Sequence, residues 1–148
     1  MPRKKVNEIV TENIFRGFYG ASTFIEKNAI PTFYGFVSKK GTNFSGYPDF
    51  FYDSDDYCLV VEAKATDHEA AQDEVQYYMV NNKIHKDVIG ISVSGQSKDN
   101  LRVTYYLKVS GLTEIKRFPQ EDTLLSIAAI KKQYINYKRA NSKREPKG

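Results

Sequence analysis

Hydrophobic and polar positions along the chain switch between a helical and a strand period. Apolar residues recur every three or four positions over residues 6–19 and 122–139, which predicts an amphipathic helix in each segment. A third helix is expected over residues 66–81, because Thr66 and Glu69 have the spacing of a capping box.

Four other segments have strand patterns. β-branched runs, or strict alternation of apolar and polar residues, predict strands at 47–53, 57–65, 87–94 and 101–108. A polar, glycine-bounded loop at 38–46 precedes the first strand, and Ser22 is expected to cap a short helix that ends near Pro31. The order helix, strand, strand, helix, strand, strand, helix predicts an α/β fold whose central mixed β-sheet is flanked by helices on both faces.

The length and composition are those of one globular domain. The chain has 148 residues, of which 41% are hydrophobic, so we expect one domain at 1–140 and a flexible basic tail, or the start of a linker, at 141–148. The single cysteine, Cys58, excludes an internal disulfide and thiolate-rich zinc sites, and we expect it in the core. The apolar runs are too short to span a bilayer, so we expect no membrane partner and a cytoplasmic location.

The net charge of +4 conceals two regions of opposite sign. Residues 1–100 contain 11 Lys and Arg against 14 Asp and Glu, whereas residues 101–148 contain 11 against 4. The segment 46–74 holds nine acidic residues and one basic residue. A basic region beside a concentrated acidic segment is typical of a polyanion-binding protein with a metal site, and also of a solvated acidic turn followed by a basic tail.

The second predicted strand carries two charged residues on an otherwise apolar face. Side chains alternate along a strand, so Cys58, Val60, Glu62 and Lys64 share one face. Burial of Glu62 without a partner would be costly, and we therefore expect a metal ion, Lys64, or both beside it.

The length of the turn decides what faces Glu62. A two-residue turn at Asp55 and Asp56 places Asp49 directly across from Glu62, about 5 Å away between β-carbons. A three-residue turn would instead place Val61 opposite Asp49 and direct Asp49 to the other face. In the first register, two carboxylates form the hard oxygen site that Mg²⁺ prefers, and Mn²⁺ is expected to substitute.

That register predicts a hydrolytic site. Asp49 and Glu62 would hold Mg²⁺ with the main-chain carbonyl of Ala63 as a further ligand, and the metal would lower the pKa of a nucleophilic water. Lys64, one step along the same face, would orient the water and stabilise the transition state of phosphodiester hydrolysis.

These residues carry a resemblance to a known superfamily. Pro48-Asp49 followed by Glu62-Ala63-Lys64 is similar to the PD-(D/E)xK nuclease signature. The segments GYPDFFY, LVVEAKA and IGISVSG resemble the endonuclease domain at the N-terminus of restriction–modification enzymes, in which a nuclease precedes an adenine-specific DNA methylase, and the related domain of type I restriction subunits. The resemblance covers roughly residues 6–110.

The resemblance implies a restriction-endonuclease-like core and a Mg²⁺-dependent DNA endonuclease of restriction type. It assigns Asp49 and Glu62 as metal ligands and Lys64 as the catalytic lysine. It also implies a methylase or specificity region as a partner, either in a longer chain or as a separate subunit. Double-strand cleavage by one active site would need two protomers or two successive visits to the DNA, so a transient homodimer is an open alternative.

Other residues are weaker candidates for the same site. Many relatives carry Gln-x-x-x-Tyr on the helix after the lysine, for which Gln72 and Gln76 are imperfect matches, and some add a helical glutamate, here Glu12 or Glu8. The loop residues Lys39, Lys40, Asn43 and Ser45 would contact the DNA backbone in a nuclease, or be simply solvated. The basic 122–139 helix has the same two interpretations.

Two other functions fit the sequence. One is a catalytically silent DNA-binding or partner-docking module on the same fold, and the other is a junction or repair nuclease.

His68 and His85 lack a second ligand at metal spacing, and both are expected at the surface.

Overall fold

A computed structural model describes residues 2–38 and 46–143 of the chain. Six strands form one sheet in the order β1-β2-β3-β4-β5-β6, in which β3 and β4 are parallel and the other neighbours are antiparallel. The strands are β1 (Ile25–Glu26), β2 (Phe50–Asp53), β3 (Tyr57–Lys64), β4 (Asp87–Ser94), β5 (Arg102–Lys108) and β6 (Ile115–Arg117). The helices are α1 (Pro2–Tyr19), α2 (His68–Val80) and α3 (Ile127–Lys143), with 3₁₀ turns η1 (Lys27–Ala29), η2 (Thr32–Tyr34) and η3 (Lys98–Asn100).

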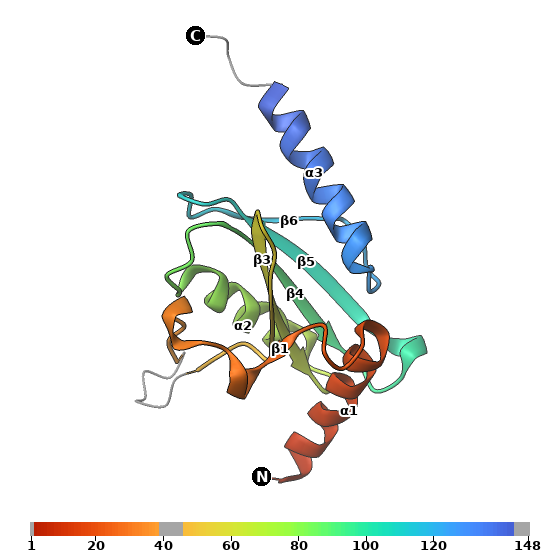
Figure 1. Cartoon of the computed structure of the whole chain (residues 1–148). Helices are drawn as coiled ribbons and strands as arrows, with labels where there is room; N and C mark the ends of the chain where they lie inside the picture. The colour runs from red at the N-terminus through yellow and green to blue at the C-terminus, as the bar shows by residue number, and fades with distance from the viewer. Residues whose placement is uncertain (1, 39–45, 144–148) are drawn as a thin grey trace.

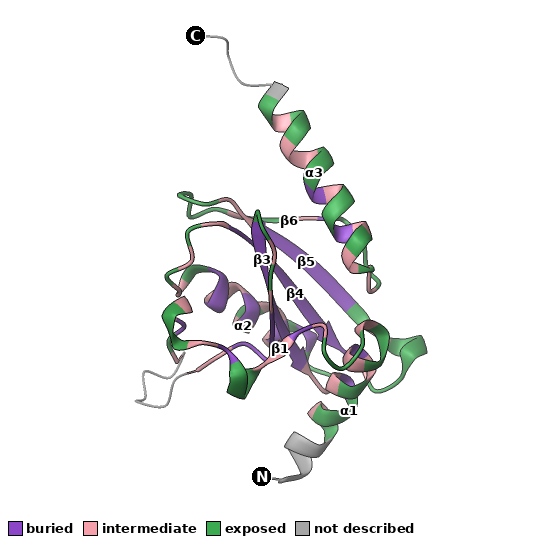
Figure 2. Cartoon of the chain, in the orientation of Figure 1, coloured by how far each residue is buried: buried purple, intermediate pink, exposed green. Residues whose placement is uncertain are grey.

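Helices α1 and α3 lie on one side of the sheet and α2 on the other (Figure 1), and each side has its own hydrophobic core. On one face, Phe15 of α1 and Ile130 of α3 pack against alternate residues of the central strands, such as Leu59. On the other face, Val75 and Met79 of α2 pack against the intervening residues. The central strands are buried on both sides, as Figure 2 shows, which explains their nearly continuous apolar sequence.

The α2 helix lies close against β4. A β-carbon added at Gly90 would lie 2.5 Å from Met79 Sδ, so a larger residue at this strand position would require the Met79 side chain to move. The helix is capped by Asp67, whose side chain accepts a hydrogen bond of 3.0 Å from the Ala70 N–H, and not by Thr66.

The predicted α/β class, the mixed sheet, and the order of the main strands and helices are confirmed. The short helix expected at 22–31 is wrong, because this segment forms the edge strand β1 and the turn η1. The edge strand β6 was not predicted, since three residues are too few to show alternation. The third helix begins at Ile127 and not near residue 122. Ser126, just before it, accepts a hydrogen bond from the Ala129 N–H in its first turn.

The first strand of the acidic hairpin is shorter than predicted and begins at Phe50. Its register nonetheless matches the two-residue turn, because Asp53 pairs with Cys58 and Phe50 pairs with Val61. Within the described ranges, no helix has both the length and the apolar character needed to cross a bilayer.

Candidate active site

Asp49 and Glu62 meet across the β2–β3 hairpin, as the two-residue turn predicts. The Asp49 N–H donates a hydrogen bond of 3.1 Å to Glu62 Oε2, and the Ala63 N–H donates one of 2.8 Å to Asp49 Oδ2. Both residues are buried, with 9% of Asp49 and 3% of Glu62 exposed. Main-chain N–H groups thus hold both carboxylates in place.

The environment of Glu62 penalises its negative charge. Burial raises the pKa of Glu62 well above its usual value, and the charges of Asp49 and Glu74 raise this pKa further. A hydrogen bond with Glu74 acts in the same direction. Glu62 therefore keeps a proton to unusually high pH unless a cation lies beside it.

Lys64 lies at the edge of this group as a cation. Its Nζ is 3.0 Å from Glu74 Oε2 and 3.6 Å from Glu8 Oε2. Partial burial opposes the charge of Lys64, but the hydrogen bond and charge of Glu74, followed by the charge of Glu8, raise its pKa. Lys64 is therefore suited to electrostatic stabilisation and not to the role of a base.

A second lysine, Lys27, was missed by the sequence analysis. Its Nζ lies 3.1 Å from Asp49 Oδ1, and its main-chain N–H donates to the Asp49 carbonyl at 3.1 Å. Although desolvation opposes it, the charges of Asp49 and Glu62 raise the pKa of Lys27. Residues 25–29 have no helical or strand period, so only the edge pairing of β1 with β2 reveals this neighbour.

The α1 helix brings two further glutamates to the site. Glu8 contacts Lys64 as described above, and burial together with the charge of Asp49 raises the pKa of Glu12. Arg16 Nη2 lies 3.3 Å from Glu12 Oε1 and partly compensates that charge. The structure thus places Glu12 beside the Asp49 carboxylate, where the sequence analysis set it as an auxiliary residue.

Gln72 and Gln76 do not join this group, contrary to their prediction as auxiliary residues. Both side chains hydrogen-bond with Tyr106 of β5, and Gln72 Nε2 also lies 3.3 Å from Thr104 Oγ1. They lie on the flank of α2 that faces β5, whereas Glu74 on the other flank faces β3. The physical reason is helical phase, because residues two positions apart on a helix point in different directions.

Glu74 and Tyr78 are the α2 residues that accompany the acidic pair. They are four residues apart, the spacing of the Gln-x-x-x-Tyr element, with glutamate in place of glutamine. Burial and the charges of Glu62 and Glu74 raise the pKa of Tyr78. The signal was present in the sequence, since Glu74 lies on the same helical stripe as the buried Ala71 and Tyr78.

The donor set fits a divalent cation with a small number of protein ligands. Across the described ranges, no three His, Cys, Asp or Glu side chains are grouped so as to hold a metal ion. Asp49 and Glu62 could supply two hard oxygen ligands, and the remaining ligands of a metal ion would have to come from the Ala63 carbonyl, water or substrate. The carboxylates of Glu8, Glu12, Asp49, Glu62 and Glu74 outnumber the ammonium groups of Lys27 and Lys64.

Several predicted residues fall elsewhere. Lys39, Lys40, Asn43 and Ser45 lie outside the described residues, although the flanking Ser38 carbonyl accepts a hydrogen bond of 2.9 Å from Tyr77 Oη on α2. Exposure of His85 and burial of Cys58 are confirmed, and burial raises the pKa of the Cys58 thiol to about 12.

His68 is buried, so its predicted surface position is wrong. Its Nδ1 lies 2.8 Å from Ser94 Oγ and its Nε2 lies 2.8 Å from Thr104 Oγ1. Burial, together with Arg102 and Arg117, lowers the pKa of His68 to about 4, so the ring is neutral near pH 7.

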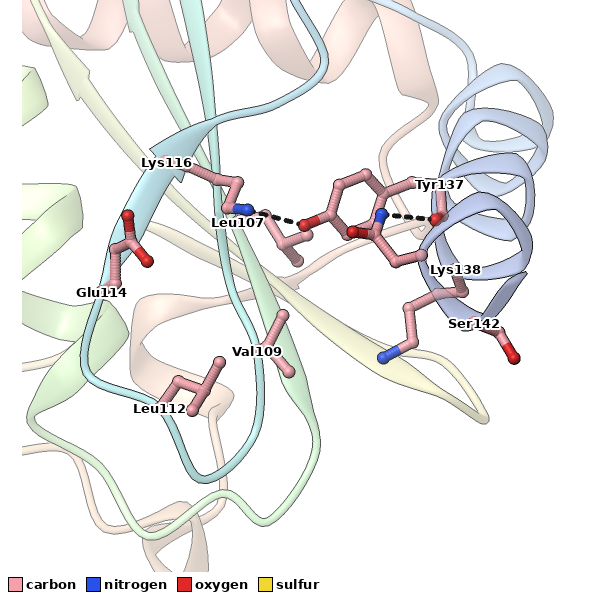
Figure 3. A pocket seen from close by; sticks show the side chains of 9 residues that line it. Leu107, Val109, Leu112, Glu114, Lys116, Tyr137, Lys138 and Ser142 are labelled. Carbon is pink, nitrogen blue, oxygen red and sulfur yellow. Dashed lines mark hydrogen bonds between the residues drawn. The ribbon is translucent and has the colours of Figure 1, made fainter. Parts of the chain in front are cut away.

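A separate cavity of about 480 Å³ lies between α3 and the β5–β6 hairpin (Figure 3). Leu107, Val109 and Leu112 form its apolar side, and Lys116 Nζ donates a hydrogen bond of 2.8 Å to Tyr137 Oη across it. None of the acidic-site residues lines this cavity, so its size does not bear on the chemistry of Asp49 and Glu62.

Comparisons with protein-family models, with curated proteins and with solved structures find no match to this chain. The arrangement of Asp49, Glu62 and Lys64, and the resemblance of the short motifs that contain them, are therefore the features that bear on function.

Proposed function

We propose that the chain is a metal-dependent DNA endonuclease domain of restriction type, with a restriction-endonuclease-like core. The observation that carries the proposal is the cross-strand pair of Asp49 and Glu62, buried and hydrogen-bonded to the main chain, on the strand that ends in Lys64. This arrangement supports the match to the PD-(D/E)xK signature in three dimensions. Composition and class of fold would fit many other functions.

In this proposal, Asp49 and Glu62 would hold Mg²⁺ or Mn²⁺ with the Ala63 carbonyl. When bound, the ion supplies charge neutralisation at a phosphate oxygen and a water of lowered pKa. Lys64 contributes a fixed positive charge beside the reacting phosphate, where its N–H groups stabilise developing negative charge. Glu74 and Glu8 are positioning residues, because they hold the Lys64 ammonium at 3.0 Å and 3.6 Å.

The proposed substrate and partners follow from the same resemblance. DNA would approach over the 38–46 loop, with Lys39, Lys40, Asn43 and Ser45 as backbone contacts. Recognition of a specific sequence is assigned to a methylase or specificity region in a longer chain or another subunit. Two copies of the domain would meet transiently for double-strand cleavage, in a cytoplasmic setting.

The test is cleavage of supercoiled plasmid DNA by the purified chain with Mg²⁺ or Mn²⁺ and with EDTA. Asp49→Asn, Glu62→Gln and Lys64→Met should each abolish nicking while retaining the folded circular dichroism spectrum. Glu69→Gln, at an exposed position of α2, is the matched control and should cleave like the wild type. Robust metal-dependent cleavage by Lys64→Met would overturn the mechanism. Linear and four-way-junction substrates, assayed together, distinguish a restriction-type enzyme from a junction or repair nuclease.

A catalytically silent DNA-binding or docking module is the second candidate. One observation favours it, namely that both lysines already have carboxylate partners, Lys27 with Asp49 and Lys64 with Glu74. Calorimetric titration with Mn²⁺ separates the two functions. Absence of binding at millimolar metal would support the silent module, whereas binding that Glu62→Gln weakens would support the nuclease.

A further inference from the structure

A second polar pocket lies on the flank of α2 that faces away from Asp49 and Glu62. Its volume is about 340 Å³, and it lies where the N-terminus of α2 meets β5 and β6. The residues that bear on its chemistry are His68, Gln72, Arg102, Thr104, Arg117 and Asp122. None of them has a role in the proposed metal site.

We call this site the arginine pocket. Its floor is rigid and neutral. His68 is 3% exposed, and its ring is held between Ser94 Oγ and Thr104 Oγ1 at 2.8 Å each. Gln72 Nε2 lies 3.3 Å from Thr104 Oγ1. Because the low pKa of His68 keeps its ring uncharged near pH 7, the positive charge of the pocket comes from the two arginines.

Arg102 and Arg117 project from neighbouring strands without acidic partners. Neither guanidinium lies within ion-pairing distance of a carboxylate in the part of the chain that the structure describes. Both are exposed, so bidentate hydrogen bonds to an anion are available to them. Asp122 also lines the pocket and reduces its formal charge from +2 to +1. A single positive charge matches a phosphodiester, which carries one negative charge.

The strand register connects this pocket to the proposed catalytic lysine. Lys64 pairs with Ser94 on β4, and Ser94 pairs with Arg102 on β5, so the three residues form a row across the face that α2 covers. Neighbouring strands are about 4.8 Å apart, which places the Cα atoms of Lys64 and Arg102 roughly 10 Å apart. Nucleotides of one strand of duplex DNA follow one another about every 3.4 Å along the helix axis, so phosphates at Lys64 and at the pocket would lie within a few nucleotides of each other.

We propose that the arginine pocket binds a backbone phosphodiester of the nucleic-acid substrate, within a few nucleotides of the scissile bond. The proposal rests on the proposed function, because it takes the substrate to be DNA. Arg102 and Arg117 hold the phosphate oxygens, and the neutral floor of His68 and Thr104 leaves the pocket open to an anion. The pocket therefore fixes the position of the DNA strand and does not read its bases.

The test measures binding of a fluorescent DNA duplex by anisotropy in EDTA, over a series of salt concentrations. The double variant Arg102→Gln/Arg117→Gln should bind at least tenfold more weakly than the wild type at 0.1 M salt. The slope of log K against log salt should fall by about 0.9, the value for one lost phosphate contact on duplex DNA. The matched control is Lys83→Gln/Lys98→Gln, two exposed positions outside both proposed sites that remove the same charge and should change affinity less than threefold.

Each result supports or overturns this inference separately from the proposed function. If the wild type cleaves DNA but the Arg102/Arg117 variant binds like the wild type or like the Lys83/Lys98 control, the pocket assignment is wrong and the nuclease proposal remains. If binding depends on the two arginines but no metal restores cleavage, the pocket assignment holds and the nuclease proposal fails. A further outcome is that inorganic phosphate at 10 mM and constant ionic strength displaces DNA from the wild type in a way that depends on these arginines. That result would assign the pocket to free phosphate and overturn the backbone role.

Discussion

Substitution of Glu62 by glutamine should stabilise the metal-free protein although it abolishes the proposed activity. Glu62 is 3% exposed, and Asp49 lies directly across the hairpin from it. Cross-strand β-carbons lie about 5 Å apart, and two carboxylates with that separation repel each other by about 3 kcal/mol at an effective dielectric constant of 20. The partly exposed ammonium of Lys27 offsets part of this repulsion, which leaves about 2 kcal/mol in favour of Glu62→Gln.

The stabilisation should depend on pH with a definite sign. The raised pKa of Glu62 means that the folded protein binds more protons than the unfolded chain above pH 4.5, the usual value for this group. Wild-type stability is therefore lost as the pH rises from 4.5 through the raised pKa, whereas Glu62→Gln lacks this loss. The gap between the two proteins should be small near pH 4.5 and largest at alkaline pH.

Thermal melts of both proteins between pH 4.5 and 8.5 measure this gap. About 2 kcal/mol corresponds to an increase in melting temperature of roughly 4–8 °C in a protein of this size. Glu121→Gln, at an exposed loop position, is the control and should melt like the wild type at each pH. Addition of Mg²⁺ should stabilise the wild type and not the variant, and so reduce the gap. A melting temperature of Glu62→Gln equal to or below that of the wild type at every pH would refute the reasoning.

Two further predictions follow from neighbouring ion pairs. Lys27→Gln should bind Mn²⁺ roughly thirtyfold more tightly by calorimetry, because a single positive charge about 4 Å from a divalent ion costs about 2 kcal/mol in water; unchanged or weaker binding would contradict this. Asp87→Asn should lower the melting temperature by roughly 4–8 °C at pH 7, through the loss of about 2 kcal/mol of charged hydrogen bonds. Burial raises the pKa of Asp87, but hydrogen bonds from the Ser110 N–H, the Tyr134 hydroxyl and Lys138 lower it overall. The difference in melting temperature between the wild type and Asp87→Asn should therefore shrink as the pH falls below 3.8. A difference that stays constant with pH would argue against an ionised Asp87.

The pairing of Asp49 with Glu62 is predictable from the sequence because it depends only on two local rules. Side chains alternate along β3, and the length of the turn at Asp55 and Asp56 sets which residue faces Glu62. The prediction therefore needed no knowledge of how the hairpin packs against the rest of the fold. The main strands were predictable for the same reason, since their apolar patterns are local.

The remaining neighbours of the acidic pair depend on tertiary packing. Lys27 reaches Asp49 because a two-residue edge strand docks beside β2, and two residues are too few to show a period. Residue type alone predicts Gln72 and Gln76 as auxiliary residues of the site, whereas the helical phase of α2 brings Glu74 to Lys64. His68 was assigned to the surface because a lone histidine usually lies there, but its position in the first turn of α2 directs it onto Ser94.

The parallel pairing of β3 with β4 explains why both proposed sites occur at the same end of the central strands. The carboxyl ends of parallel strands lie together, so Lys64 and Ser94 end side by side, and the chain leaving β3 must turn there to begin α2. The strands are apolar along most of their length, and polar side chains are tolerated where α2 begins and the core ends. The helix then divides this end into two flanks, with Glu74 directed at the acidic pair and Gln72 at the arginine pocket. One topological feature thus supplies a strongly acidic flank suited to a metal ion and a basic flank suited to a phosphate.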